Sequence, residues 1–198
     1  MPNSAATTVL LCGVGGQGTI LAADVLAHVA LESGVTVKVS EIHGMAQRGG
    51  AVTTVVRFGE EVHSMVADLG CTDCIVSFET TEALRNLPYL KEDGYLLVAD
   101  ETIKPMPVQT CKAEMPRNVR KTLESEGATI IPAVELARSI GSPKSVNIVL
   151  LGALSTQLDF PLDAWEKVIA ERVPPKTVDA NIKAFQAGRD FADQHSER

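Results

Sequence analysis

Residues 8–42 read TVLLCGVGGQGTILAADVLAHVALESGVTVKVSEI, and this stretch decides the predicted fold. The apolar run at 8–12 predicts a strand that leads into a glycine-rich loop. From 19 to 33 the apolar residues recur at helical spacing, and Gly34 ends the helix. Residues 35–42 alternate apolar and polar side chains, which predicts a second strand. The three elements together predict a βαβ unit with two parallel, paired strands and a right-handed crossover.

The chain beyond this unit continues to alternate strands and helices until its last third, which is helical. Further strands are predicted at 51–58, 74–78, 95–99 and 128–131, with a short return strand at 62–65. Helices are predicted at 82–90, 117–126, 132–140, 146–158, 162–172 and 177–194. Thr80 or Thr81 is the expected cap of the helix at 82–90, Asp93-Gly94 is an expected turn, and two prolines exclude a regular helix at 104–107.

This order of elements predicts the α/β class, with a mostly parallel Rossmann-like sheet flanked by helices and a C-terminal helical extension. No linker-like composition interrupts the chain. We therefore expect one domain over residues 1–198, with an α/β core at about 7–145 and the helical extension at about 146–198.

Composition and charge narrow the class of protein. Of the 198 residues, 45% are hydrophobic, which is enough for a buried core, and the net charge of −7 argues against a nucleic-acid binder. The start of the chain lacks the basic and apolar regions of a secretory signal, and no apolar stretch is long enough to span a bilayer. We expect a cytoplasmic protein with neither a nucleic-acid nor a membrane partner.

The four cysteines do not predict a metal site. Only Cys71 and Cys74 have the spacing of a ligand pair, and there is no second pair to complete a zinc site or an iron–sulfur cluster. We expect two reduced thiols at the start of a strand, and no metal held by this chain alone.

The glycine-rich loop is a candidate anion site. Gly13, Gly15 and Gly18 match the dinucleotide-binding pattern, after a strand and before a helix, where backbone N–H groups and the helix dipole favour a phosphate. Glu41, near the end of the second strand, stands where such proteins hold a ribose. Gly16-Gln17 is unusual inside this pattern, and the glycines could equally serve tight packing of strand and helix.

A second polar loop follows the second strand, over residues 41–50 (EIHGMAQRGG). Because loops after parallel strands share one edge of a sheet, we expect it to lie near the glycine-rich loop. Arg48 could bind a phosphate or carboxylate, with His43 and Gln47 as supporting residues, although a salt bridge between Glu41 and Arg48 could also simply fix the loop. The candidate binding residues are Gly13, Gly15, Gly16, Gln17, Gly18, Glu41, Gly49 and Gly50.

Both loops resemble those of the gamma-type domain of the pyruvate/2-oxoacid:ferredoxin oxidoreductase family. The resemblance extends over nearly the whole chain, through the segments at 56–59, 78–85 and 147–154 and through Asn181, Phe185 and Gly188. The form of residues 43–50 resembles the small (beta) subunits of the family's indolepyruvate branch.

The resemblance implies a heteromeric enzyme. In this family a 2-oxoacid is oxidatively decarboxylated, coenzyme A takes the acyl group as co-substrate, and ferredoxin is reduced through the complex. The resemblance assigns thiamine diphosphate, Mg²⁺ and [4Fe-4S] clusters to a larger alpha subunit, without which this chain is expected to be inactive. The alternatives are a gamma-type subunit for pyruvate or another 2-oxoacid, a stand-alone NAD-binding Rossmann-like protein, or a non-catalytic assembly protein.

Overall fold

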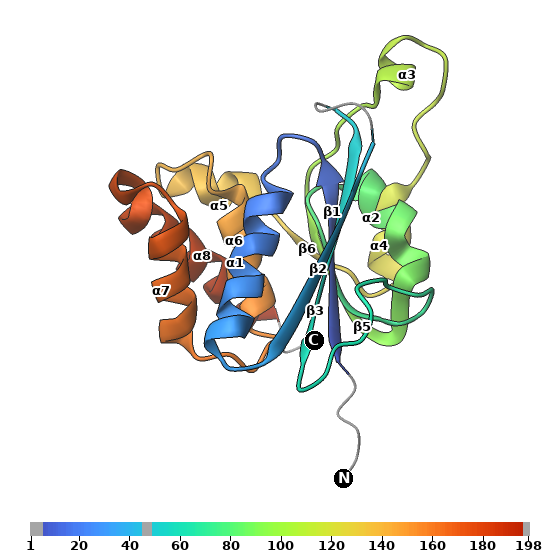
Figure 1. The fold of residues 1–198 in the computed structure, drawn as a ribbon. Helices are drawn as coiled ribbons and strands as arrows, with labels where there is room; N and C mark the ends of the chain where they lie inside the picture. Colours follow the sequence, from blue (N-terminus) through green and yellow to red (C-terminus); the bar gives the residue numbers. More distant parts are fainter. Residues whose placement is uncertain (1–5, 45–48, 196–198) are drawn as a thin grey trace.

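The computed structural model describes residues 6–44 and 49–195 and shows one six-stranded sheet between two layers of helices (Figure 1). The strands are β1 (Thr7–Val14), β2 (Thr36–His43), β3 (Ala51–Gly59), β4 (Thr72–Ser77), β5 (Leu90–Ala99) and β6 (Thr129–Ile131). Their order across the sheet is β2-β3-β1-β4-β5-β6. The α/β class with a mostly parallel sheet is confirmed.

Strand β3 is the one strand of the described sheet that runs against the others. It pairs antiparallel with both β1 and β2, whereas the β1–β4, β4–β5 and β5–β6 pairs are parallel. The predicted pairing of β1 with β2 is therefore wrong, because β3 lies between them. Strand β3 is largely buried and rich in β-branched residues, which suits an inner position, while the polar alternation of β2 suits an edge.

One face of the sheet carries most of the helices. Helices α1 (Thr19–Glu32), α5 (Ala133–Ser139), α6 (Val146–Ser155), α7 (Leu162–Arg172) and α8 (Val178–His195) lie together on it (Figure 1). The larger core cluster joins them to the sheet and includes Trp165 and Phe185, both fully buried. Helices α2 (Thr80–Asn86) and α4 (Val119–Ser125) cover the other face over a smaller core.

Helices α6 and α8 pack at unusually close range. A Cβ atom on Gly152 would lie 1.9 Å from the Phe185 carbonyl oxygen, and one on Gly188 would lie 1.9 Å from the Val149 carbonyl oxygen. No side chain fits at either distance, so both glycines are required for this contact. Nine of the ten residues of α6 are buried, which makes it the central helix of its layer.

Several local predictions need correction. The cap of α2 is Glu79, not Thr80 or Thr81, because its carboxylate accepts hydrogen bonds from the N–H groups of Thr81 and Glu82. The predicted helix at 82–90 ends at Asn86, where Pro88 forces a 3₁₀ turn at Leu87–Tyr89.

Three further segments also differ from expectation. Residues 62–65 form no strand, and Asp93-Gly94 lies within β5 beside a shift in strand register. The single turn α3 (Met106–Gln109) does form, since its prolines stand before the helix and in its first turn, where an N–H is not needed. A second 3₁₀ turn, Pro175–Thr177, precedes α8.

Within residues 6–44 and 49–195, the structure contains no helix with the length and apolarity that a bilayer span requires.

Candidate functional site

The glycine-rich loop lies between the end of β1 and the start of α1, at the edge of the sheet where the parallel strands end. Gly16 and Gly18 have φ values of 104° and 84°, a backbone region that favours glycine. A Cβ atom on Gly16 would meet nothing within 4 Å, so this residue stands open at the loop surface.

The side chain of Gln17 turns inward and fills the loop. Its Oε1 accepts a hydrogen bond from the Val14 N–H at 2.7 Å, and its Nε2 donates to the Phe78 carbonyl oxygen at 2.9 Å. A Cβ atom on Gly13 would lie 2.8 Å from Gln17 Oε1 and 2.8 Å from Phe78 Cβ. Gly13 therefore makes room for Gln17, and Gln17 ties the end of β1 to the residue after β4.

Gly18 has a packing role as well. A Cβ atom there would lie 2.8 Å from Asn147 Nδ2, and this nitrogen donates to the Gly18 carbonyl oxygen at 3.3 Å. The contact holds the starts of α1 and α6 together, although 129 residues separate the two positions. The pattern of glycines thus reflects packing at Gly13 and Gly18, while Gly15 and Gly16 face the neighbouring loop or open space.

The second polar loop lies beside the first, as predicted. The Gly15 N–H donates to the Gly50 carbonyl oxygen at 2.8 Å, and Val14 pairs with Ala51 in the sheet. The cause differs from the prediction, because the two loops meet through the antiparallel β1–β3 pair. Gly49 has a φ of 76°, which suits the turn into β3. Met45 to Arg48, with the candidates Gln47 and Arg48, lie outside the described residues.

Glu41 and His43 lie on the edge strand β2, and both are exposed. Glu41 stands opposite Thr54 of β3, so a whole strand separates it from β1. In dinucleotide-binding proteins the ribose-binding acid ends the strand next to the glycine loop. The arrangement here does not match that geometry.

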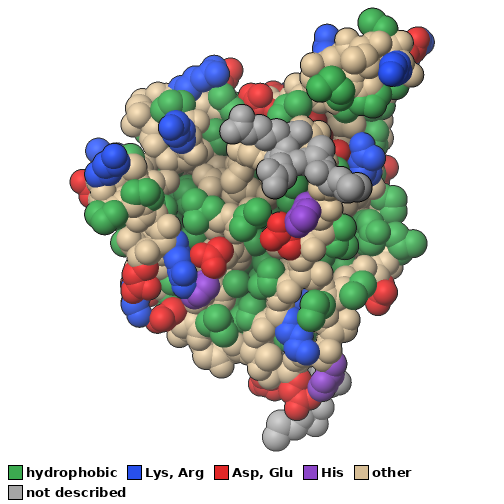
Figure 2. All heavy atoms as spheres, turned by 45° about the horizontal axis from the view of Figure 1, so that its top comes forward, with side chains coloured by type: hydrophobic (Ala, Val, Ile, Leu, Met, Phe, Trp, Pro, Cys, Tyr) green, Lys and Arg blue, Asp and Glu red, His purple; other side chains and the backbone are tan. Residues whose placement is uncertain are grey.

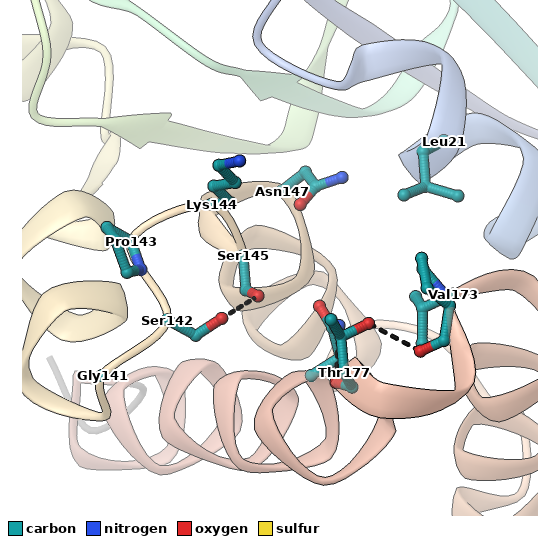
Figure 3. Close-up of a pocket in the computed structure, with 11 residues that line it drawn as sticks. Leu21, Gly141, Ser142, Pro143, Lys144, Ser145, Asn147, Val173 and Thr177 are labelled. Atoms are coloured by element: carbon teal, nitrogen blue, oxygen red, sulfur yellow. Dashed lines mark hydrogen bonds between the residues drawn. The ribbon is translucent and has the colours of Figure 1, made fainter.

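A cavity of about 490 Å³ adjoins the glycine-rich loop through Asn147 (Figure 3). Its wall consists of Leu21 of α1, residues 141–145, the start of α6 and the turn before α8. Ser142 and Ser145 face each other across a 2.7 Å hydrogen bond between their hydroxyls, and Lys144 extends from the same loop. The sequence predictions passed over this loop, although GSPKS before an apolar helix is a signal for a turn at a helix start.

Two buried acidic residues, Glu79 and Glu82, lie at the start of α2, just after the end of β4. Glu79 is 1% exposed and caps the helix. Glu82 pairs with Arg85 through one carboxylate oxygen, 3.2 Å from Arg85 Nε, and its other oxygen has no hydrogen-bond partner among the described residues. Burial raises the pKa of Glu82, an effect that Arg85 opposes and Glu79 adds to. These acids were not among the predicted site residues.

The cysteines are free thiols. Cys12 and Cys74 are buried, and burial raises the pKa of each to about 12, so both stay protonated at neutral pH. Cys71 and Cys111 are exposed. In the described part of the chain no three His, Cys, Asp or Glu side chains stand close enough together to hold a metal ion.

Known proteins are similar to this chain in both sequence and fold. Residues 8–191 match the family described as pyruvate ferredoxin/flavodoxin oxidoreductase. A relative from Thermococcus kodakarensis, named indolepyruvate oxidoreductase subunit IorB, is 41% identical over 187 residues, which cover 91% of this chain and 93% of that protein.

Two solved structures extend the comparison. Pyruvate oxidoreductase subunit PORC from Thermotoga maritima is 28% identical, with a TM-score of 0.71 over 93% of this chain and 96% of its own. The 2-oxoglutarate:ferredoxin oxidoreductase from Magnetococcus marinus, solved with 2-oxoglutarate, coenzyme A and succinyl-CoA bound, has a TM-score of 0.74 at 21% identity. The match covers 96% of this chain but 31% of that longer one, so the fold also occurs as a part of a larger polypeptide.

Proposed function

The chain belongs to the pyruvate ferredoxin/flavodoxin oxidoreductase family, and from this premise we propose that it is the small subunit of an indolepyruvate:ferredoxin oxidoreductase. The observation that carries the proposal is the 41% identity to a named IorB subunit over nine tenths of both chains. The complex would decarboxylate an aryl-pyruvate oxidatively, form an acyl-CoA and reduce ferredoxin. A cytoplasmic location belongs to the same proposal.

The cofactors of this reaction belong to a larger partner subunit. Iron–sulfur clusters require several converging thiolates, and here two of the four thiols are buried and protonated. The described residues provide no cluster of metal-ligating side chains either. Together with the family resemblance, these features support our assignment of thiamine diphosphate, Mg²⁺ and the [4Fe-4S] clusters to the alpha subunit.

This chain contributes the polar edge formed by its two loops. Arg48 would contact an anionic group of the 2-oxoacid or of coenzyme A, with His43 and Gln47 beside it. At Gly16 and Gly49 a ligand would meet open backbone, whereas Gly15 and Gly50 join the two loops, and Glu41 borders the same edge. Gln17 holds the glycine-rich loop in shape, which is a positioning role.

Co-expression with the candidate large subunit tests the proposal. A tag on this chain should co-purify that subunit, and the pair should reduce a viologen in the presence of indolepyruvate and coenzyme A. Faster turnover with aryl-pyruvates than with pyruvate or 2-oxoglutarate supports the indolepyruvate branch, whereas the reverse order assigns the chain to another 2-oxoacid. Absence of a complex, together with saturable NADH binding by the isolated chain, would overturn the proposal.

The role of Arg48 has its own test in the same assay. Arg48→Ala should lower kcat/KM about tenfold or more while the complex still assembles. Arg138→Ala, a change at an exposed arginine of α5, is the matched control and should leave turnover unchanged. An Arg48→Ala complex with normal kinetics contradicts the assignment.

A further inference from the structure

Residues 103–115 form an arm that projects from the body of the molecule between β5 and α4 (Figure 1). It leaves the sheet at the edge where the glycine-rich loop also lies. In the upper right of Figure 2 it carries both hydrophobic and basic side chains.

The base of the arm is firmly attached. The Thr80 N–H donates to the Glu101 carbonyl oxygen at 2.8 Å, and the hydroxyls of Thr80 and Thr102 lie 2.8 Å apart. Thr102 and Pro116, which flank the arm, line the same cavity of about 430 Å³. The two ends of the arm are therefore close together, as in the compact surface loops that often have a binding role.

The arm has a fixed internal shape. The Lys112 N–H donates to the Pro107 carbonyl oxygen at 2.8 Å and the Cys111 N–H to the Val108 carbonyl oxygen at 3.1 Å. This is the hydrogen-bond pattern that ends a helix with a left-handed residue, and Cys111 has the matching φ of 56°. Together with the prolines, these bonds restrict the conformations open to the arm.

Contacts with the body of the protein leave the arm unburied. Every residue from 103 to 115 is exposed or only half-buried, and Met106 is 67% exposed. Fixing a residue costs about 1–2 kcal/mol in backbone entropy, which burial of apolar side chains normally offsets. Here Ile103, Met106, Val108 and Met115 are the side chains whose burial a partner would complete.

We propose that the arm is a docking element for the larger subunit, with Met106 as its main apolar contact. The inference rests on the proposed function. The arm starts at the edge that we assign to the shared active site, so one partner can cover both. The same fold occurs as 31% of a longer chain, where further polypeptide accompanies it, which favours another subunit over a second copy of this chain.

The test uses the complete two-subunit complex. Met106→Asp places a charge in the apolar contact, and replacing residues 103–115 by a short Gly-Ser linker removes the arm while its close ends can still join. Leu162→Asp is the matched control, because Leu162 is an exposed leucine of α7, on the opposite side of the molecule. Both arm variants should weaken the complex about tenfold or more, with Leu162→Asp unchanged, as measured by biolayer interferometry.

The outcomes separate the two proposals. If the wild-type chain forms an active complex and both arm variants bind the large subunit equally well, the docking role of the arm is overturned. The proposed function then remains. Wild-type chain without complex or activity overturns the function. A concentration-dependent dimer of the isolated chain that Met106→Asp abolishes would assign the arm to a second copy. Because Met106 is exposed, an unchanged thermal unfolding temperature of Met106→Asp shows that its effect is on binding.

Discussion

At the scale of single residues, the glycine-rich loop shows what a sequence pattern can and cannot predict. The pattern correctly places the loop between a strand and a helix. It leaves open whether the glycines bind a ligand or make room for neighbouring side chains, because that depends on Gln17. The inward rotamer of Gln17 is fixed by a carbonyl group 61 residues further along the chain. Asn147 meets Gly18 in the same way across a long separation. Such contacts depend on the tertiary structure, which local periodicity does not contain.

Glu82 makes the stability of the protein depend on pH. Burial raises its pKa above the ordinary value of 4.5, so the folded state holds this proton more tightly than the unfolded state. As the pH rises from 4.5 through the raised pKa, the unfolded chain releases the proton first and the free energy of unfolding falls. The side chain in the Glu82→Gln variant cannot ionise, so this variant should gain stability relative to wild type as the pH rises through this range.

Urea unfolding at a series of pH values measures this difference. Glu92→Gln, at an exposed carboxylate of β5, is the control and should follow the wild-type curve. A constant difference between Glu82→Gln and wild type at all pH values would show that Glu82 has an ordinary pKa.

At the scale of elements, the sequence predicted where strands and helices form better than it predicted which strands lie side by side. Residues 35–42 and 51–58 were correctly assigned as strands, since both have clear β patterns. The βαβ rule then paired β1 with β2, whereas the more deeply buried β3 takes the inner position. Alternation within a strand indicates which faces are buried, but the choice of neighbour depends on how the whole sheet divides its buried and edge positions.

The close contact of α6 with α8 gives a prediction at this scale. Gly188→Ala would force a methyl group against the Val149 carbonyl oxygen, so the helices must separate. We expect the free energy of unfolding to fall by about 3 kcal/mol. Gln186→Ala, at an exposed position of the same helix, should change it by less than about 0.5 kcal/mol. Chemical denaturation of both variants measures these free energies of unfolding. Equal values for Gly188→Ala and Gln186→Ala would mean that the helices lie further apart than described.

At the scale of the whole molecule, the last third of the chain belongs to the main core. Helices α6, α7 and α8 share the larger hydrophobic cluster with β1, β3 and α1. The sequence indicated that these residues are helical but not that they cover a face of the sheet. It also missed the cavity beside Asn147, which forms only when α1, α6 and α8 come together.

Truncation tests how far the C-terminal helices can be separated from the rest. A chain that ends at Leu158 loses α7 and α8 with Trp165 and Phe185, and it exposes α6 to water. We expect it to lose its cooperative thermal transition, as followed by circular dichroism. Gln186→Ala, at an exposed position of α8, is the control, with an unchanged transition. Cooperative unfolding of the shorter chain would instead show that residues 7–158 fold without α7 and α8.

The central position of β1 restricts the order in which the sheet can be assembled during synthesis. Its two neighbours are β3 and β4, and both follow it by more than 35 residues in the chain. A nascent chain that has emerged from the ribosome as far as β2 therefore contains two strands that are not paired with each other in the native sheet. Both edges of β1 stay open until β3 has emerged, so nascent chains shorter than about 60 residues have no native sheet to form.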